Sequence, residues 1–256
     1  MNTLSQRPLV ASIGVVVIAL LSLQIGAVIT GHPAENTGPA LLAYIVPIIV
    51  ACAGLWWLKL TSLLSPAGFR PASMVRLGWP ILTVSMVFFA VNLVFMKEPT
   101  AEESAGSIKR LVFLVLIMAA TAFFEEVIFR GIVQHILISN PDITYSRAVI
   151  VSAILFALAH LANLIHSPEM IIATSSQVLY AFALGVFLSS LMLRTRNLWL
   201  PIIGHFIFNV LGSFTSVFTL PDTPASDIPI FAGILQLVLI SPLLIIGLRW
   251  LKKDHS

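Results

Sequence analysis

Apolar runs of about 20 residues recur along this chain, and they constrain its fold more than any other feature. A helix needs about 20 apolar residues to cross the ~30 Å hydrocarbon core of a bilayer. Runs of this kind lie at 9–29, 39–59, 77–96, 111–138, 147–165, 170–193, 198–219 and 229–250. The sequence therefore predicts an all-α fold, a polytopic transmembrane bundle of about eight helices.

The composition excludes a soluble protein. Charged residues make up only 10% of the 256 residues and hydrophobic residues 58%, whereas a soluble domain carries about 25% charged residues. The connections between the runs are short, so we predict one integral membrane domain over 1–256. The first run is longer than the apolar region of a signal peptide, so we expect it to be a retained span. The single cysteine, Cys52, excludes an intrachain disulfide.

The basic residues predict the orientation. Eight spans with a cytoplasmic N-terminus put ten of them on one side: Arg7, Lys59, Arg70, Arg76, Arg147, Arg194, Arg196, Arg249, Lys252 and Lys253. The other side receives Lys97, Lys109 and Arg110, while Arg130 lies within a span. Because cytoplasmic loops are enriched in Lys and Arg, we predict a multi-pass protein of the cell membrane with both termini cytoplasmic (N-in/C-in). The net charge of +3 suggests contact with anionic lipid headgroups and gives no reason to invoke nucleic acid.

The fourth run carries three ionisable residues, Glu125, Glu126 and Arg130. A charged side chain at mid-bilayer costs at least ~2.5 kcal/mol on insertion scales and is a functional candidate by default. Glu126 and Arg130 are four residues apart, so they share a helix face and can form an ion pair. Glu125 lies about 100° around the helix and is left to face a cavity as a general base. The alternative is a buried charge cluster that only holds helices together.

Two further runs place polar residues four apart. The fifth holds Phe156 and His160, and the seventh holds His205 and Asn209. A lone histidine in a span is more often a packing residue, but His205 and Asn209 offer two donors aimed at one point, as an oxyanion site requires. At ~1.5 Å per residue, the polar groups of runs four, five and seven lie at similar depths. We expect them to meet in one cavity, reached from the cytoplasm.

These three motifs, Glu-Glu-x-x-x-Arg, Phe-x-x-x-His and His-x-x-x-Asn, occur in this order, each on a predicted span. Together they resemble the CPBP family of intramembrane proteases, which includes the type II CAAX prenyl endopeptidases and the Abi bacteriocin-immunity proteins. The resemblance covers about 111–212, which we treat as the catalytic core. It implies an intramembrane endopeptidase that hydrolyses a peptide bond with an activated water.

The resemblance also implies roles for the residues at the motif positions. Glu125 matches the catalytic glutamate and His160 its partner in activating water. His205 and Asn209 match the groups that stabilise the oxyanion. The supporting residues are Glu126 and Arg130.

Several alternatives stay open at this point. We favour water activation without a required cofactor, since there is no HExxH zinc motif, but Glu125, His160 and His205 could supply three ligands to zinc. The implied partners are the lipid bilayer and a peptide or membrane-protein substrate, with a prenylated C-terminus as one form. A proton-coupled transporter would use the same buried groups as a relay, yet the sequence lacks the internal symmetry common in such folds. A non-proteolytic bacteriocin self-immunity protein is the third alternative.

Overall fold

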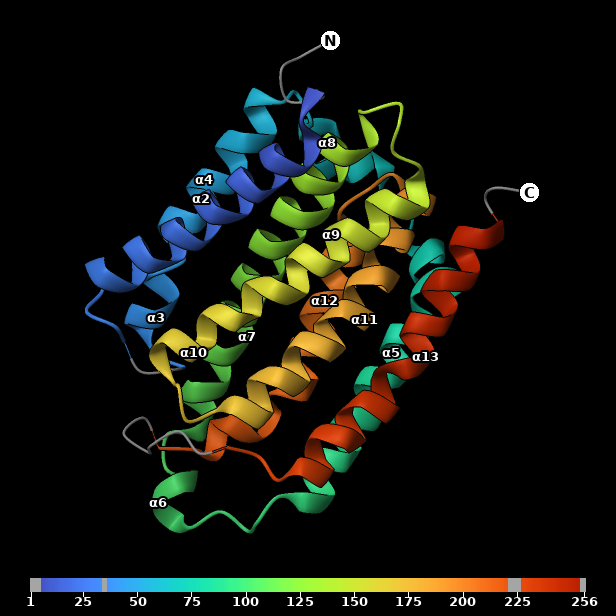
Figure 1. Cartoon of the computed structure of the whole chain (residues 1–256). Helices are drawn as coiled ribbons and strands as arrows, with labels where there is room; N and C mark the ends of the chain where they lie inside the picture. Colours follow the sequence, from blue (N-terminus) through green and yellow to red (C-terminus); the bar gives the residue numbers. More distant parts are fainter. Residues whose placement is uncertain (1–5, 34–35, 221–226, 254–256) are drawn as a thin grey trace.

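The structure is a computed structural model that describes residues 6–33, 36–220 and 227–253. These ranges contain helices and no strand, which confirms the predicted all-α class. The main helices are α2 Pro8–Ile29, α4 Ile45–Trp57, α5 Pro71–Phe95, α7 Ser107–Glu126, α9 Tyr145–Ala159, α11 Ile171–Thr195, α12 Trp199–Gly212 and α13 Ile230–Lys253 (Figure 1). The short α-helices are α3 Gly38–Leu42, α6 Ala101–Ser104, α8 Gln134–Ile138 and α10 Asn163–His166. The remaining turns are the 3-10 helices η1 Thr61–Leu64, η2 Pro66–Gly68, η4 His160–Ala162 and η5 Phe214–Phe218, and the π-helix η3 Val127–Val133.

Each of the eight predicted apolar ranges contains a helix. In the described part of the chain, seven segments are long and apolar enough to cross a bilayer: Pro8–Ile29, Gly38–Trp57, Pro71–Phe95, Ser107–Ile138, Tyr145–Ile165, Ile171–Thr195 and Ile230–Lys252. The remaining helix, α12 in the seventh apolar range, has only 14 residues. At ~1.5 Å per residue it spans ~21 Å, which is shorter than a bilayer core. The polytopic helical bundle is therefore confirmed, with one helix shorter than the sequence predicted.

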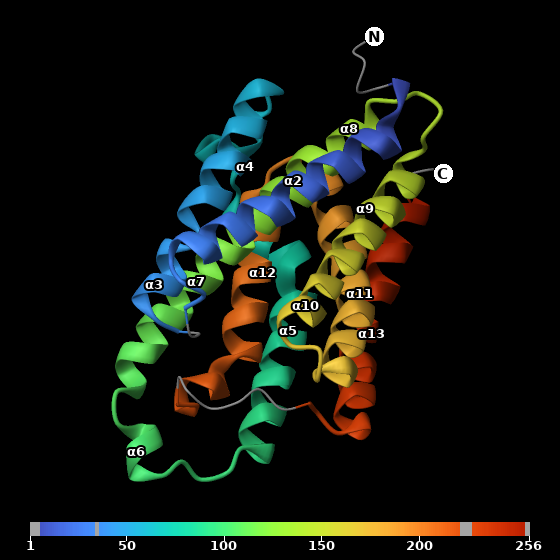
Figure 2. The ribbon, with the colours of Figure 1, turned by 60° about the vertical axis from the view of Figure 1, so that its left-hand side comes forward.

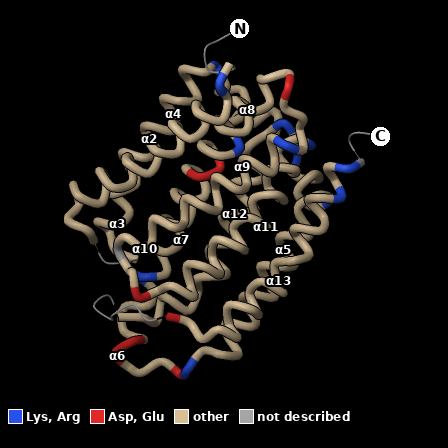
Figure 3. Tube along the Cα trace, viewed as in Figure 1, with Lys and Arg blue, Asp and Glu red and all other residues tan. Residues whose placement is uncertain are grey.

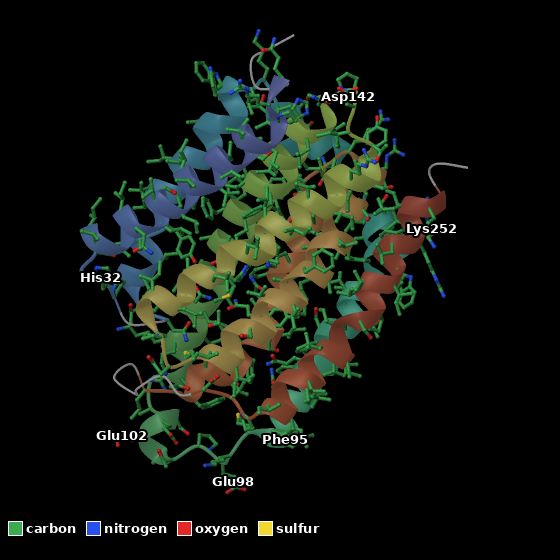
Figure 4. The ribbon with its side chains drawn as sticks, in the orientation of Figure 1. His32, Phe95, Glu98, Glu102, Asp142 and Lys252 are labelled. Carbon is green, nitrogen blue, oxygen red and sulfur yellow. The ribbon has the colours of Figure 1, made fainter. Side chains whose placement is uncertain are left out.

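Both ends of the described chain lie at one end of the bundle. α2 begins and α13 ends there (Figure 1), and most basic residues gather at this end (Figure 3). Figure 4 labels Asp142 and Lys252 at this end, which we call the termini-side end. It labels His32, Glu98 and Glu102 at the opposite end, which we call the far end. An even number of crossings is needed to return the chain to its starting end. The seven long segments therefore require α12 as one more crossing.

Small residues let α11 approach its neighbours closely. A Cβ atom at Gly247 of α13 would lie 3.0 Å from Cα of Phe187, and one at Gly185 would lie 3.1 Å from Cβ of Ala153 on α9. The Ser190 hydroxyl also donates to the carbonyl oxygen of Gly247 over 3.2 Å. Small residues are favoured at helix contacts in membranes because they permit this close packing. α11 is thereby fixed between α9 and α13.

The helix α12 lies at the centre of the bundle, where it packs on α5, α7 and α11 (Figure 2). None of its residues is exposed. The segment that follows α4 holds its beginning: the Leu198 amide donates to the Leu63 carbonyl over 2.9 Å, and the Trp199 indole donates to the Leu64 carbonyl over 2.8 Å. Irregular backbone at membrane depth is tolerated where protein covers it. These hydrogen bonds fix the position of α12 along the bundle, and therefore the depth of its side chains.

Candidate functional site

The fourth crossing changes its helical geometry at the predicted site. It is α-helical up to Glu126 and then continues as the π-helix Val127–Val133, all of whose residues are buried. Such π segments are rare and often occur at functional sites. The two glutamates therefore lie at the last α-helical residues before the change. The apolar pattern of the sequence does not predict this change from α-helix to π-helix.

Glu126 is the centre of a buried charge network. Its Oε1 accepts a hydrogen bond of 2.9 Å from Nη1 of Arg130 and one of 2.7 Å from Nδ1 of His205. The side chains of Glu126 and Arg130 are fully buried. The ion pair predicted from the four-residue spacing is therefore present, and the same carboxylate also joins α7 to α12.

Glu125 faces a different direction, as the helical geometry predicts. Its side chain is 19% exposed and lines a cavity of about 540 Å³. Its Oε2 lies 3.6 Å from Nε2 of His205, so the two ring nitrogens of His205 face different carboxylates. An ionised carboxylate can only accept hydrogen bonds, so Nδ1 donates to Glu126. Nε2 then carries a hydrogen only when His205 is an imidazolium.

His160 lines the same cavity as Glu125. It ends α9 and begins the 3-10 turn η4, and its Nδ1 donates to the carbonyl oxygen of Phe156 over 2.9 Å. When one ring nitrogen of a neutral imidazole donates, the other is an acceptor. The Nε2 of His160 is therefore available to accept a hydrogen bond.

The ring of Phe156 connects the charged and neutral parts of the site. It lies edge-to-face with His160 and His205, with centroids 4.9 and 5.9 Å apart, and the guanidinium of Arg130 lies 4.3 Å from its centroid. These are favourable aromatic and cation–π geometries. Phe156 thus positions both histidines and Arg130, a role that the motif alone did not reveal.

The cavity reaches the far end of the bundle. Its lining runs along α2 from Val16 to Ala27 and on to His32 and Pro33 beyond that helix, and its other walls come from α3, α7, η3, α9, η4 and α10. Toward the termini-side end, α2 contacts α8 and α9. We expected the cavity to be reached from the cytoplasm, the side predicted for the termini. On that side α2 packs against the bundle, and the cavity instead extends toward the far end.

Asn163 is a further polar residue of this cavity. It lies three residues after His160, across a 3-10 turn in which such positions are eclipsed. Its Nδ2 donates to Oε1 of Gln177 on α11 over 2.8 Å. Asn163 was not among the predicted site residues, although its spacing from His160 is a signal that could have identified it.

Asn209 is not placed with the other site residues. It lies one turn beyond His205 on α12, is half-buried, and, like His205, does not line the cavity; unlike His205, it has no polar contact with Glu125 or Glu126 within the described ranges. Its role in an oxyanion site stays a prediction. The structure does bring together Glu125, Glu126, Arg130 and His205, and Phe156 connects His160 to this group.

A zinc site would need the side chains of Glu125, His160 and His205 to converge on one point. Among the described residues, no group of three His, Cys, Asp or Glu side chains is placed to hold a metal ion. Glu125, His160 and His205 are therefore not assembled as a ligand set. As arranged, these residues do not fit zinc.

The family comparison agrees with this geometry. Residues 107–211 match a protein-family model, and the match runs from the start of α7 into α12, across all three motifs. This match confirms the resemblance stated from the sequence. The matched family is the type II CAAX prenyl endopeptidases, Rce1-like. Comparison with curated proteins finds no match for the chain.

Proposed function

We propose that the chain is an intramembrane endopeptidase that activates water with Glu125 and His160 and requires no metal. The observation that carries this proposal is the position of the Glu125 carboxylate. It lines one cavity together with His160, and it lies 3.6 Å from Nε2 of His205. The site thus offers a carboxylate base, a neutral imidazole acceptor and a second imidazole next to that base. The match to a protease family supports the proposal.

In this mechanism, a water molecule binds between Glu125 and Nε2 of His160. Glu125 removes one proton as the water oxygen attacks the carbonyl carbon of the scissile peptide. The new C–O bond leaves a negative charge on the former carbonyl oxygen. Glu125 then passes its proton to the peptide nitrogen, the C–N bond breaks, and an acid and an amine leave.

His205 stabilises the negative oxygen in its imidazolium form. Nδ1 donates to Glu126, so only the imidazolium has a second N–H to offer from Nε2. In that form, the positive charges of His205 and Arg130 balance the two carboxylates, those of Glu125 and Glu126. The four side chains together then have no net charge. Asn209 is the second proposed donor. Loss of one such donor typically costs about 2.7–4 kcal/mol of transition-state stabilisation.

The proposed substrate is a peptide or a membrane-protein segment, and a prenylated C-terminus remains one form of it. We also propose that the protein lies in the cell membrane with both termini cytoplasmic, since the basic residues gather at that end. The cavity then reaches the non-cytoplasmic side. Single cysteines at Asp142 and Glu102 in a Cys52→Ala background would test this orientation. A membrane-impermeant maleimide should label only Glu102→Cys in intact cells; labelling of Asp142→Cys alone would contradict it.

The function is tested by comparing membrane peptides of a deletion strain that carries wild type, Glu125→Gln or Glu102→Gln. Glu102 is an exposed residue of α6 and provides the matched control. New peptide termini should appear with wild type and Glu102→Gln and be absent with Glu125→Gln. Equal cleavage by the Glu125→Gln protein, at equal membrane abundance, would overturn the assignment of the base.

A further inference from the structure

A second cavity, of about 660 Å³, opens among the helix ends of the termini-side end. It lies between α5, α8, the start of α9 and the ends of α11 and α13, and it shares no lining residue with the cavity of Glu125. Its polar lining includes Arg76, Arg130, Gln134, His135, Arg194 and Arg196, and among the residues that the structure describes no Asp or Glu lines it. The cavity is therefore strongly cationic.

The most buried polar residues of this cavity have atoms without partners. Arg130 and Gln134 are each 1% exposed. Arg130 uses Nη1 for Glu126, but within the described residues its Nε and Nη2 have no hydrogen-bond acceptor. Gln134 donates from Nε2 to the Ser189 carbonyl over 3.2 Å, while its Oε1 has no donor in the described part of the chain.

Unmet hydrogen bonds of this kind are costly. A buried polar group without a partner costs about 1–3 kcal/mol, and a charged one more. The face of the Arg130 guanidinium packs on Phe156, which leaves the N–H groups at its edge to be satisfied. These atoms have almost no exposed surface, so a ligand reaches them only when the side chains that cover them move. Such a ligand must offer anionic oxygens to Arg130 and a hydrogen-bond donor to Gln134.

We propose that this cavity binds a phosphate ester that also carries a hydroxyl group. Arginine forks match the geometry of phosphate oxygens. Arg76, Arg194 and Arg196 add positive potential around the opening, which concentrates anions. The hydroxyl group of the ligand donates to Oε1 of Gln134. Two sources supply this chemistry: a glycerol phosphate headgroup of a lipid, or soluble glycerol phosphate.

This site is distinct from the proposed protease site, although the two share one side chain. Arg130 contacts Glu126, and Glu126 contacts His205, which faces Glu125. The binding measurement below uses no peptide cleavage. Failure of the protease proposal would therefore leave this inference standing, and the reverse also holds.

The test measures ligand binding to the purified full chain in a neutral detergent. Native mass spectrometry compares phosphatidylglycerol with phosphatidylcholine of the same acyl chains, and titration calorimetry measures soluble glycerol phosphate. One saturable site for phosphatidylglycerol alone supports the lipid source. Saturable binding of glycerol phosphate that displaces the lipid supports the soluble source. The proposal is overturned if neither ligand binds saturably or if phosphatidylcholine binds equally well.

Matched variants separate the cavity from general surface charge. The double variant Arg76→Gln/Arg196→Gln removes two charges that line the cavity. The control Arg70→Gln/Arg249→Gln removes two exposed charges outside its lining. We expect about tenfold weaker binding in the first variant, as for lost charge-assisted contacts, and unchanged binding in the second. Equal losses of binding in both variants would show that surface charge alone causes the effect, and they would overturn the assignment of this site.

The hydroxyl group has its own test. Phosphatidylmethanol carries the same phosphate diester without the headgroup hydroxyls, so it should bind more weakly than phosphatidylglycerol. In Gln134→Leu, the two lipids should bind with equal affinity. Equal affinity of both lipids for the wild-type protein would overturn the assignment of Gln134.

Discussion

Nδ1 of His205 donates to Oε1 of Glu126 over 2.7 Å, a contact between residues 79 positions apart. The same oxygen accepts from Nη1 of Arg130 over 2.9 Å. One carboxylate oxygen therefore orients the histidine of α12 and neutralises the arginine of the π-helix. Loss of its charge should affect both partners.

Glu126→Gln keeps the shape of the side chain but leaves Arg130 as an unpaired buried cation. Breaking a buried pair in this way typically costs about 3–5 kcal/mol. We expect a large loss of stability in detergent unfolding and a fall in cleavage of at least about tenfold. The double variant Glu126→Gln/Arg130→Gln should be less destabilised than the sum of the two single variants. Strict additivity would show that the pair contributes no coupling.

Removal of metal should leave activity unchanged. The Nδ1 of His205 is occupied by Glu126, and no three candidate ligands converge among the described residues. Purified protein treated with a chelator should therefore retain full cleavage of its substrate, and elemental analysis should find less than stoichiometric zinc. Stoichiometric zinc whose removal abolishes activity, and whose return restores it, would contradict this expectation.

Gly26 is expected to tolerate no side chain. A Cβ atom there would overlap the carbonyl oxygen of Ala43, whereas one at Gly14 would meet no atom within 4 Å. Overpacking of this kind costs about 1–3 kcal/mol, so Gly26→Ala should lower the unfolding temperature. Gly14→Ala on the same helix provides the control and should be neutral or stabilising, because alanine favours the helix. Equal effects of both variants would show that α2 can move away from Ala43.

Asp227 should make stability depend on acid pH. Its carboxylate accepts hydrogen bonds from the amides of Ile172 and Ala173, both 2.8 Å, at the start of α11. Partial burial acts to raise the pKa of Asp227, but these backbone hydrogen bonds outweigh it and lower the pKa below the ordinary 3.8. The stabilisation is therefore complete when the pH is above the ordinary pKa of 3.8. It is lost as the pH falls through the lower pKa of Asp227 in the folded protein.

The measurement for Asp227 is the unfolding temperature between about pH 7 and pH 2. The unfolding temperature of the wild type should exceed that of Asp227→Asn by a constant amount near neutral pH and by a smaller amount at acid pH. Asp142→Asn, in an exposed turn, should show no such change in difference. A constant difference between wild type and Asp227→Asn over the whole range would contradict the capping role.

The sequence predicted what depends on local spacing and bulk hydrophobicity. The apolar runs located the helices, and the spacing of Glu126 and Arg130 predicted their pair. Spacing could not identify His205 as the second partner of Glu126, because that contact depends on how α7 and α12 pack. The end of α12 was also missed: the apolar residues after Gly212 form the 3-10 turn Phe214–Phe218, and hydrophobicity does not distinguish the two helix types. The same limit hid the π-helix.

The position of α12 has a consequence for what the bilayer demands of it. A helix in contact with lipid must match the thickness of the hydrocarbon or distort the bilayer. The residues of α12 are all buried or half-buried, so its neighbours meet most of that demand in its place. The helix that carries His205 can therefore be as short as its packing allows. Changes of membrane thickness should act on the outer helices first and reach His205 only through them.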